Sequence, residues 1–520
     1  MPNCSRGRTT RLVVLLAALL LSACSSLPSL DNRSASYAPP PDATTALAQY
    51  ARPMLDKHPG ESGFKPLVDG EDAFIARLRL IAVAEKTVDA QYYIWHDDLT
   101  GRVLHYALLQ AADRGVRVRL LLDDLDTAGK DTVLRTLDAH PNIEVRVFNP
   151  FANRQNRAAD FLGDTSRVNR RMHNKTLTVD GMASIFGGRN IGDEYFAAGE
   201  DVGFGDMDAV SVGGVAGEIE SQFDLYWNSD WAYPIASFSW DSAVTAADLD
   251  AYRSELAQFM DEARHSHYAQ ILKQYRLATS DLRESDFSWS PWVLAYDQPD
   301  KVVAKEVSAD THLAPQLRKA LDITRHDLVI VSPYFVPGEQ FTEYLTDMVQ
   351  RGVRVRILTN SLAANDVSLV HAGYMRYRKA LLRGGVELYE YRADANKVTA
   401  KRRKEERIGA SKASLHGKFF GFDRSHLFIG SFNLDGRSYA LNTELGVYFA
   451  SPQQAGLLSD SFDAIAGRLA YQLHLDDRGD IVWHSRSGAS AATVDHEPDT
   501  TWWQRFSTRV LSWIVPESQL

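Results

Sequence analysis

Two short segments of the chain carry the same set of reactive residues at the same spacing. In each segment a Lys follows a His by two residues, an Asp follows the Lys by five, and Gly-x-x-Asn begins seven residues after the Asp. The residues are His173, Lys175, Asp180 and Asn190 in the first segment, and His416, Lys418, Asp423 and Asn433 in the second. Two basic side chains and an amide can hold an anion, and the duplication predicts a chemical role rather than a structural one.

Strand-like sequence surrounds both motifs. The runs TLTV and FFGF, which directly follow Lys175 and Lys418, are rich in β-branched and aromatic residues. Side chains two apart on a strand share a face, so we expect the His and Lys of each copy to project together.

The pattern HxKxxxxD followed by GGRN or GSFN resembles the paired signature of the phospholipase D superfamily. The flanking sequences are most similar to bacterial cardiolipin synthases of the C type, and this resemblance runs from about Leu67 to the C-terminus. The segments that carry it are QYYIWHDDLTG, AADRGVRVRLLLDD, IEVRVFNPF, NRRMHNK, FGGRNIGDEYF, TNSLAANDVSLVHAGYMRYR and GSFNLDGRS.

The resemblance implies a mechanism that needs both motifs. One imidazole attacks a phosphodiester and forms a phosphohistidine, while the other protonates the leaving alcohol and later deprotonates the acceptor. By the resemblance His173 is the nucleophile, although the residues alone leave the choice between His173 and His416 open. Lys175 and Lys418 would hold the non-bridging oxygens.

Further site residues follow from comparing the two copies. Asn190 and Asn433 are expected to add neutral donors to the phosphate, and Ser431, which stands where the first copy has Gly188, is a third candidate for substrate binding. Asp180 and Asp423 belong to the signature, but they lie an odd number of residues from the Lys. We therefore expect both to face away from the phosphate and brace the fold.

Each catalytic His needs a partner that fixes its tautomer. Aligning the halves selects Glu444 as the partner of His416 and Asp208 as the parallel residue in the first half, the alternative being that both are surface carboxylates. Four cationic and amide donors can replace a metal ion, and no acidic metal-binding run accompanies the motifs. We expect neither a metal nor another cofactor.

The length, net charge and cysteine content of the chain limit the classes of protein to which it can belong. A chain of 520 residues is long enough for two or three domains, and its net charge of -10 argues against a nucleic-acid partner. Only Cys4 and Cys24 occur, both before the folded part, so the domains have no disulfide.

The N-terminus predicts export and a lipid anchor. Arginines precede a short apolar run, and Leu21-Ser22-Ala23-Cys24 resembles a bacterial lipobox, the alternative being an ordinary signal peptide. Residues 1–23 would be removed, Cys24 would carry lipid, and 24–60 would form a tether. Ser25 after the Cys favours the outer membrane of a Gram-negative cell, with the enzyme facing the periplasm.

The remaining chain predicts an α/β fold built from a duplicated domain. Helices are expected over 72–84, 101–114 and 218–229, with strands over 88–95 and 116–124, and RGVRVR occurs once in each half. We predict two pseudo-twofold-related phospholipase D-like sandwiches with mixed central sheets. Their ranges are 61–245 and 296–475, with a helical linker over 246–295 and a tail over 476–520.

Two segments keep alternative interpretations. The basic loop over 397–412 is either a lid for anionic headgroups or a solvated face. The tail helix around Trp503, Phe506, Val510, Trp513 and Ile514 either lies in a membrane interface or packs on the enzyme's own core.

The predicted activity is phosphatidyl transfer between phospholipids. By resemblance the chain would make cardiolipin from phosphatidylglycerol, with phosphatidylethanolamine or a second phosphatidylglycerol as donor. Hydrolysis to phosphatidic acid is the alternative, since water can resolve the same intermediate. A nuclease activity is a third alternative, but the acidic net charge and the predicted lipid anchor argue against it. The sequence does not indicate an oligomeric state.

Overall fold

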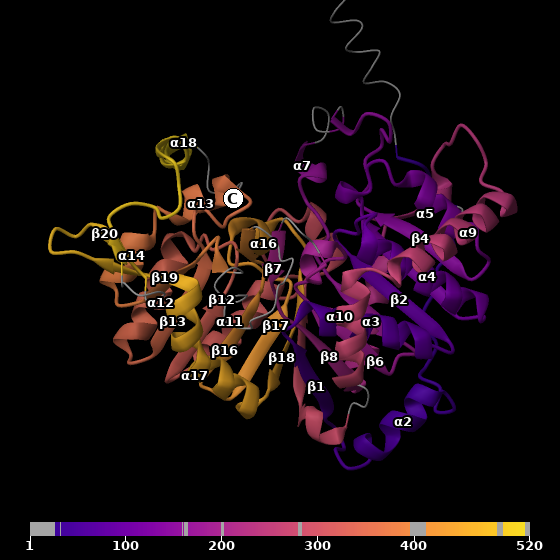
Figure 1. Cartoon of the computed structure of the whole chain (residues 1–520), viewed down its shortest axis with the longest axis horizontal. Helices are drawn as coiled ribbons and strands as arrows, with labels where there is room; N and C mark the ends of the chain where they lie inside the picture. The colour runs from indigo at the N-terminus through magenta and orange to yellow at the C-terminus, as the bar shows by residue number, and fades with distance from the viewer. Residues whose placement is uncertain are drawn as a thin grey trace, which may run out of the picture.

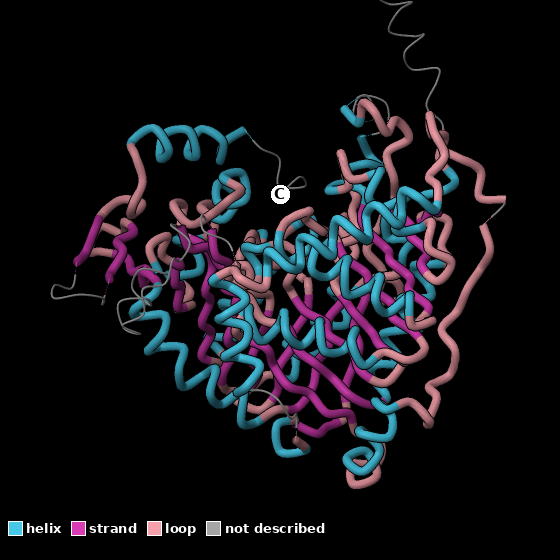
Figure 2. The backbone as a smooth tube through the Cα atoms, turned by 45° about the vertical axis from the view of Figure 1, so that its right-hand side comes forward, coloured by secondary structure: helices cyan, strands magenta, loops and turns pink. Residues whose placement is uncertain are grey.

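The computed structural model describes residues 27–31, 33–158, 160, 165–198, 202–278, 283–395, 412–485 and 492–514. The predicted signal peptide and Cys24 lie outside these residues, as does the basic loop up to residue 411. Helices and strands alternate through the described chain, and Figure 2 shows the helices on the outside of two sheets.

Two large sheets with matching topology form the two halves of the molecule (Figure 1). The first runs β10-β1-β8-β6-β5-β2-β3-β4-β9, and the second runs β11-β18-β17-β16-β12-β13-β14-β19-β20-β21. In each, three neighbouring strands are parallel, β2-β3-β4 and β12-β13-β14, and the flanking strands are antiparallel. The predicted duplication and the mixed central sheets are thereby confirmed.

The strands have the following bounds. In the first sheet they are β1 Ser62–Leu67, β2 Thr87–Tyr92, β3 Arg117–Asp123, β4 Ile143–Phe148, β5 Thr176–Val179, β6 Ala183–Gly187, β8 Asp208–Gly213, β9 Ala232–Pro234 and β10 Ser288–Ser290. In the second they are β11 Trp292–Tyr296, β12 Asp327–Val331, β13 Arg354–Asn360, β14 Glu387–Tyr391, β16 Phe419–Phe422, β17 His426–Gly430, β18 Leu445–Ala450, β19 Ala470–Leu475, β20 Ile481–Ser485 and β21 Ala492–Val494. A separate pair joins β7 Val202–Gly205 to β15 Lys412–Leu415.

Helices cover both faces of each sheet. In the N-terminal half they are α2 Ala46–Leu55, α3 Gly70–Val83, α4 Leu99–Asp113, α5 Asp131–Asp138, α7 Thr165–Val168, α8 Gly214–Trp227, α9 Ala246–Ala263 and α10 His267–Ala278. In the C-terminal half they are α11 Leu313–Ile323, α12 Gly338–Gln350, α13 Ser368–Tyr374, α14 Arg378–Arg383, α16 Gly436–Ala440, α17 Pro452–Leu469 and α18 Trp502–Ile514.

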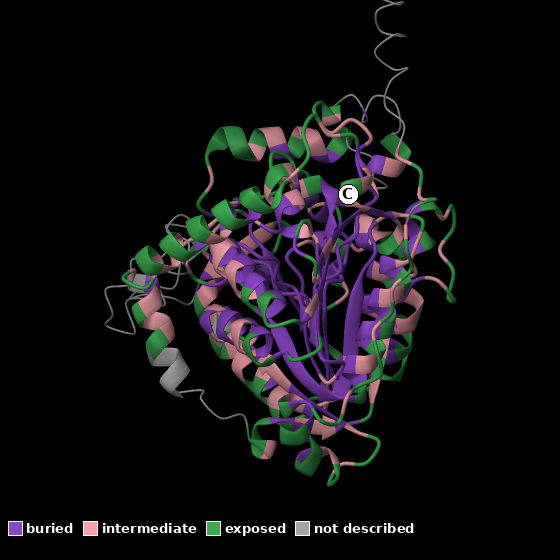
Figure 3. Ribbon diagram, turned by 90° about the vertical axis from the view of Figure 1, so that its right-hand side faces the viewer, coloured by how far each residue is buried: buried purple, intermediate pink, exposed green. Residues whose placement is uncertain are grey.

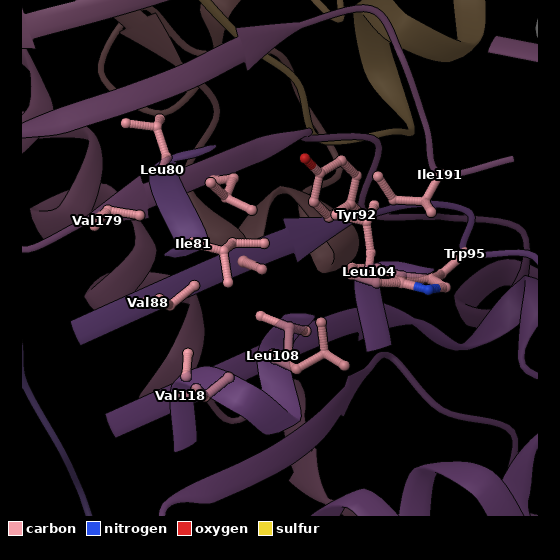
Figure 4. Packing of buried hydrophobic residues seen from close by; sticks show 14 of the residues in the cluster. Leu80, Ile81, Val88, Tyr92, Trp95, Leu104, Leu108, Val118, Val179 and Ile191 are labelled. Atoms are coloured by element: carbon pink, nitrogen blue, oxygen red, sulfur yellow. The ribbon is translucent and has the colours of Figure 1, made fainter. Parts of the chain in front are cut away.

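The helix predicted over 101–114 is α4, and both of its ends have recognisable caps. Asp98 caps α4 by accepting from the amide of Gly101, and Gly115, with φ of +93°, ends the helix in a conformation that favours glycine. Inward-facing residues of α3 and α4 pack on the parallel strands in the core drawn in Figure 4, among them Ile81, Leu104 and Leu108. Figure 3 shows the same burial across the sheets, with the exposed residues on the helices and loops that surround them.

The other face of the first sheet packs on α8. Phe223 and Trp227 are both fully buried there, as their spacing of four predicts. A further cluster crosses between the halves, where Phe64 stacks on Phe449 with ring centroids 4.3 Å apart. Apolar burial between the sheets therefore fixes the two halves against each other.

Three of the predicted domain boundaries are wrong. The segment expected as a free tether lies on the first domain, where Arg119 donates to the carbonyl of Ser36, and it contains α2. The expected linker includes β10, which pairs with β1, and β11, which pairs with β18. The tail contributes β20 and β21 to the second sheet. In each case unpaired backbone groups are satisfied by extending an existing sheet or packing on it.

Candidate active site

Each motif is held by main chain from the other half of the molecule. The amide of His173 donates to the carbonyl of Thr443 at 2.8 Å, and the amide of His416 donates to the carbonyl of Gly205 at 2.8 Å. The second contact continues the β7–β15 pair, which is itself a link between the halves. The motif His residues thus precede β5 and β16 in inter-domain segments, and the prediction that each lies within its strand is wrong.

The four basic motif residues are all buried. His173, Lys175, His416 and Lys418 are each at most 6% exposed. Burial lowers the pKa of His173 well below its ordinary value, and the charges of Lys175 and Lys418 lower it further. Burial and the charge of Lys418 likewise lower the pKa of His416, with a smaller contribution from Lys175. The lysine of each motif thus acts on the histidine of the other, which indicates that the two motifs lie close together.

Glu444 orients His173. Its carboxylate lies 2.9 Å from Nδ1 of that ring, and it accepts hydrogen bonds from Ser431 at 2.5 Å and Ser438 at 2.7 Å. Burial raises the pKa of Glu444, whereas Lys175 and the two hydroxyls lower it. The expected pairing of Glu444 with His416 is wrong, because the carboxylate contacts His173 of the other half.

Asp206 is the corresponding partner of His416. Its Oδ2 lies 2.6 Å from Nδ1 of the ring, and the side chain is fully buried. Burial raises the pKa of Asp206, but His416, Lys418 and Arg189 outweigh that effect and lower it overall. An ionised Asp206 therefore favours the protonated form of His416.

The prediction of Asp208 as a His partner is wrong by two residues. Asp208 accepts a hydrogen bond from Arg77 at 2.9 Å and another from the amide of Arg189. The strand registers show the reason, because Gly187 pairs with Asp208 whereas its counterpart Gly430 pairs with Gly446. Asp208 is thus equivalent to Gly446, and the residue equivalent to Glu444 is Asp206.

The difference between Gly188 and Ser431 also has a structural cause. A Cβ at Gly188 would lie 2.2 Å from Oδ1 of Asp206, so no side chain fits there. Ser431 instead donates to Glu444, where the longer carboxylate leaves room for a hydroxyl. Ser431 is therefore a positioning residue for His173, and its prediction as a substrate ligand is not supported by its contacts.

The two lysines fold back onto their own histidines. Lys175 donates to the carbonyl of His173, and its ammonium lies 5.3 Å from the centre of the Tyr93 ring. The ammonium of Lys418 lies 2.9 Å from Nδ1 and 3.1 Å from Nε2 of His416. The charge of Lys418 therefore lies at the ring of its histidine, and the charge of Lys175 lies at the backbone of His173.

Two asparagines and two tyrosines complete the set of site residues. The side-chain oxygens of Asn190 and Asn433 are buried without a hydrogen-bond partner, and the Asn190 amide nitrogen donates to the Tyr195 hydroxyl at 2.8 Å. Tyr93 packs edge-on against His173 and Tyr195 edge-on against His416, with centroids 4.9 and 5.0 Å apart. Substrate binding by the two amides stays a prediction, whereas the repeated tyrosine–histidine contact was not predicted.

Asp180 and Asp423 act away from the phosphate site. Asp180 accepts from three successive amides, residues 85–87, and Asp423 from the amides of 325–327. Both have a positive φ, 53° and 48°, which Asp tolerates better than most residues. These contacts brace the turn after each motif strand, as the sequence predicts.

Two other clusters of described residues could offer metal ligands. His96, Asp98 and Glu194 are half-buried, and His371, Glu390 and Glu497 are buried. Arg378 donates to both carboxylates of the second cluster, which makes it an ion-pair network. Neither cluster contains a motif residue, so the site is built from cationic and amide donors.

The buried Lys418 sets an expected alkaline limit. Burial lowers its pKa to about 8, so its ammonium is present below that pH and is lost as the pH rises through it. We expect kcat/KM, which reports the free enzyme, to fall above about pH 8. The Lys418→Arg variant should be slower but lack this limb, because arginine stays charged. If the Lys418→Arg variant kept the same alkaline fall in kcat/KM, the titrating group would be a residue other than Lys418.

Comparison with known proteins gives the same domain structure. A family model described as "cardiolipin synthase, PLD-like domain" matches twice, over residues 78–227 and 317–466. The matches contain both motifs.

Individual relatives cover most of the chain. Cardiolipin synthase C of Escherichia coli K12 is 42% identical to this chain over 486 residues, which cover 90% of this chain and 98% of the relative. Cardiolipin synthase B of the same strain is 24% identical over 456 residues, which cover 87% of this chain and 92% of the relative. Among solved structures, the phosphatidylserine synthase of Haemophilus influenzae Rd KW20 has a TM-score of 0.54 at 13% identity, covering 89% of this chain and 96% of that one. This structural likeness confirms the fold.

Proposed function

Since the chain belongs to the family of cardiolipin synthases with phospholipase D-like domains, we propose that it is a phosphatidyltransferase that makes cardiolipin. The observation that carries the proposal is the pair of buried histidines, each hydrogen-bonded to a carboxylate of the other domain. Two imidazoles in one buried space supply both a nucleophile and an acid–base group.

In the first step, Nε2 of His173 attacks the phosphorus of a phospholipid. The bond from phosphorus to the headgroup oxygen breaks, and His416 gives that oxygen a proton. The pKa of His173 lies well below its ordinary value, which keeps the ring neutral, whereas ionised Asp206 offsets part of the lowering of the pKa of His416. These environments support the assignment of His173 as nucleophile.

In the second step, a hydroxyl of phosphatidylglycerol attacks the phosphohistidine. His416 takes the hydroxyl proton, the new phosphorus–oxygen bond forms, and His173 leaves as a neutral imidazole. Lys175 and Lys418 offset the charge on the equatorial oxygens in both steps. The donor is phosphatidylethanolamine or a second phosphatidylglycerol, because both give the same phosphatidyl intermediate.

Product analysis tests transfer against hydrolysis. Vesicles of phosphatidylglycerol and phosphatidylethanolamine should yield mainly cardiolipin and little phosphatidic acid, because a buried site disfavours water as the acceptor. Thin-layer chromatography of the lipids measures both products, and vesicles of phosphatidylglycerol alone identify the donor. Phosphatidic acid as the main product at saturating phosphatidylglycerol would reject the synthase and leave a phospholipase D.

We further propose that Cys24 carries lipid and anchors the enzyme in the cell envelope, facing the periplasm. Multiple acyl chains would hold it firmly, at about 0.8 kcal/mol per buried methylene. The lipobox sequence and the lipid substrates support this proposal, and Ser25 favours the outer membrane. Cys24→Ser should abolish incorporation of radiolabelled palmitate, with Cys4→Ser as the matched control. Equal labelling of Cys24→Ser and the unaltered chain would exclude the anchor.

A further inference from the structure

The C-terminal helix α18 is seated on the second domain by its small polar side chains. Thr508 and Ser512 are its buried residues, and Arg376, just after α13, donates to the carbonyl of Ser512 at 2.7 Å. Prediction of a helix is confirmed here, but the face that packs on the enzyme is the polar one. The two alternatives for this tail are therefore not exclusive.

The chain leading into α18 is fixed by buried polar contacts. Glu497 accepts from Arg378 of α14 at 2.5 Å and lies 3.5 Å from Nε2 of His371 of α13. Tyr471 of β19 donates to Asp499 at 2.6 Å. Burial raises the pKa of Glu497, but Arg378 and His371 outweigh that effect and keep it well below its usual range. An ionised Glu497 paired in this way holds the start of the helix in place.

The opposite face of α18 presents large apolar side chains to solvent. They are Trp502 at 65% exposed, Trp503 at 64%, Phe506 at 47%, Trp513 at 79% and Ile514 at 70%. Three of the ten tryptophans of the chain are in this set. A monomeric protein rarely leaves so many large apolar side chains together on one rigid helix without a partner.

The composition of the helix indicates what covers this face. Arg505 and Arg509 are its charged residues, and no Asp or Glu occurs from 502 to 514. Tryptophan beside arginine is typical of a helix lying at a bilayer surface, where aromatic rings enter the boundary and cations meet anionic headgroups. A net positive helix on a chain of net charge -10 is complementary to anionic phospholipid.

The position of α18 agrees with a membrane on one side of the molecule. Figure 1 shows α18, α13 and α7 on the upper side of the molecule, where the first described residues also lie, with α16 below them between the two halves. Helix α16 begins three residues after Asn433, and α7 ends five residues before His173, so this edge carries the active-site segments. None of the described helices is long and apolar enough to cross a bilayer.

We propose that the exposed aromatic face of α18 docks on an anionic phospholipid bilayer and seats the active-site edge against it. The inference rests on the proposed function, because the substrates would then be components of the surface that the helix binds. Docking would shorten the path of a lipid headgroup to the buried histidines and keep the acyl chains in the bilayer.

The test compares two triple variants of the full-length protein. In the first, Trp502, Trp503 and Trp513 are all replaced by Ser, and in the second all three are replaced by Phe. Leu457→Ser with Ile323→Ser, exposed at 54% and 61% elsewhere on the surface, is the matched control. Each protein is assayed on vesicles of phosphatidylglycerol and phosphatidylethanolamine and on dispersed short-chain forms of the same lipids.

The Ser triple should lose at least about tenfold in kcat/KM on vesicles and little on dispersed lipid, whereas the Phe triple and the control should keep both. Lipids brominated on their acyl chains should quench tryptophan fluorescence of the unaltered protein but not of either triple. The quenching measurement reports membrane contact even if no cardiolipin forms. Quenching without any cardiolipin would reject the proposed function but leave the docking proposal intact. Equal losses of the Ser triple on both substrates, or full activity on vesicles, would overturn docking. Conversion of a dimer to a monomer by the Ser triple would also overturn it, by assigning the face to a second copy.

Discussion

Replacing either motif histidine by alanine is expected to abolish turnover with the fold kept. His173→Ala removes the nucleophile and His416→Ala removes the proton donor, and each step of the reaction needs both imidazoles. We expect each variant to lose on the order of 10³-fold or more in kcat. Circular dichroism should be unchanged, because the motif backbone is held by main-chain bonds to Thr443 and Gly205 rather than by the rings.

An activated substrate separates the two roles. A phosphatidyl ester of p-nitrophenol needs no proton on its leaving group, so it should restore release of p-nitrophenol in His416→Ala but not in His173→Ala. The opposite pattern of rescue would make His416 the nucleophile. Retention of a tenth or more of wild-type turnover by either variant on natural lipids would contradict the two-histidine mechanism.

The second large effect is expected at the orienting carboxylates. Asp206→Asn keeps the size of the side chain but removes the charge that faces Nδ1 of His416, and Glu444→Gln removes the charge that faces Nδ1 of His173. By analogy with other carboxylate–histidine pairs, each should lower kcat by about 10²- to 10⁴-fold. The pH profile should also change, since the loss of a carboxylate lowers the pKa of the histidine beside it.

Asp208→Asn is the matched control for Asp206→Asn. It alters an equally buried carboxylate two residues away, one that bonds Arg77 and the amide of Arg189 instead of a histidine. We expect this variant to lower the melting temperature, because Arg77 loses its buried counter-charge, while folded enzyme keeps turnover within tenfold. A larger loss of turnover in Asp208→Asn than in Asp206→Asn would instead support Asp208, the residue expected from the sequence, as the carboxylate that orients a histidine.

The duplicated fold and the reactive residues could be predicted because their signals are local. The spacing from His173 to Asn190 recurs in the second half, and the strand and helix patterns around it have ordinary periodicity and caps. Positive φ at Asp180 and Asp423 explains why an aspartate ends each motif strand. Such features need no knowledge of distant contacts.

The partners of the histidines could not be predicted, because they depend on long-range pairing. Glu444 lies in the same half of the sequence as His416, but the chain before β18 runs along the first motif and brings it to His173. The choice of Asp208 over Asp206 depended on a strand register, which a sequence of alternating acidic residues leaves ambiguous. The only hint was Gly188, whose missing side chain leaves space for Asp206.

The exchange of carboxylates between the halves has a consequence for how this gene can change. Two copies of a motif suggest that one copy is a spare, free to diverge while the other keeps working. Here a mutation in one half can remove the histidine of that half. It can also remove the carboxylate that orients the histidine of the other half. The duplication therefore gave no redundancy. Selection must preserve the match between the halves as strictly as it preserves the motifs, and an ancestor with a single domain would have had to self-associate to work.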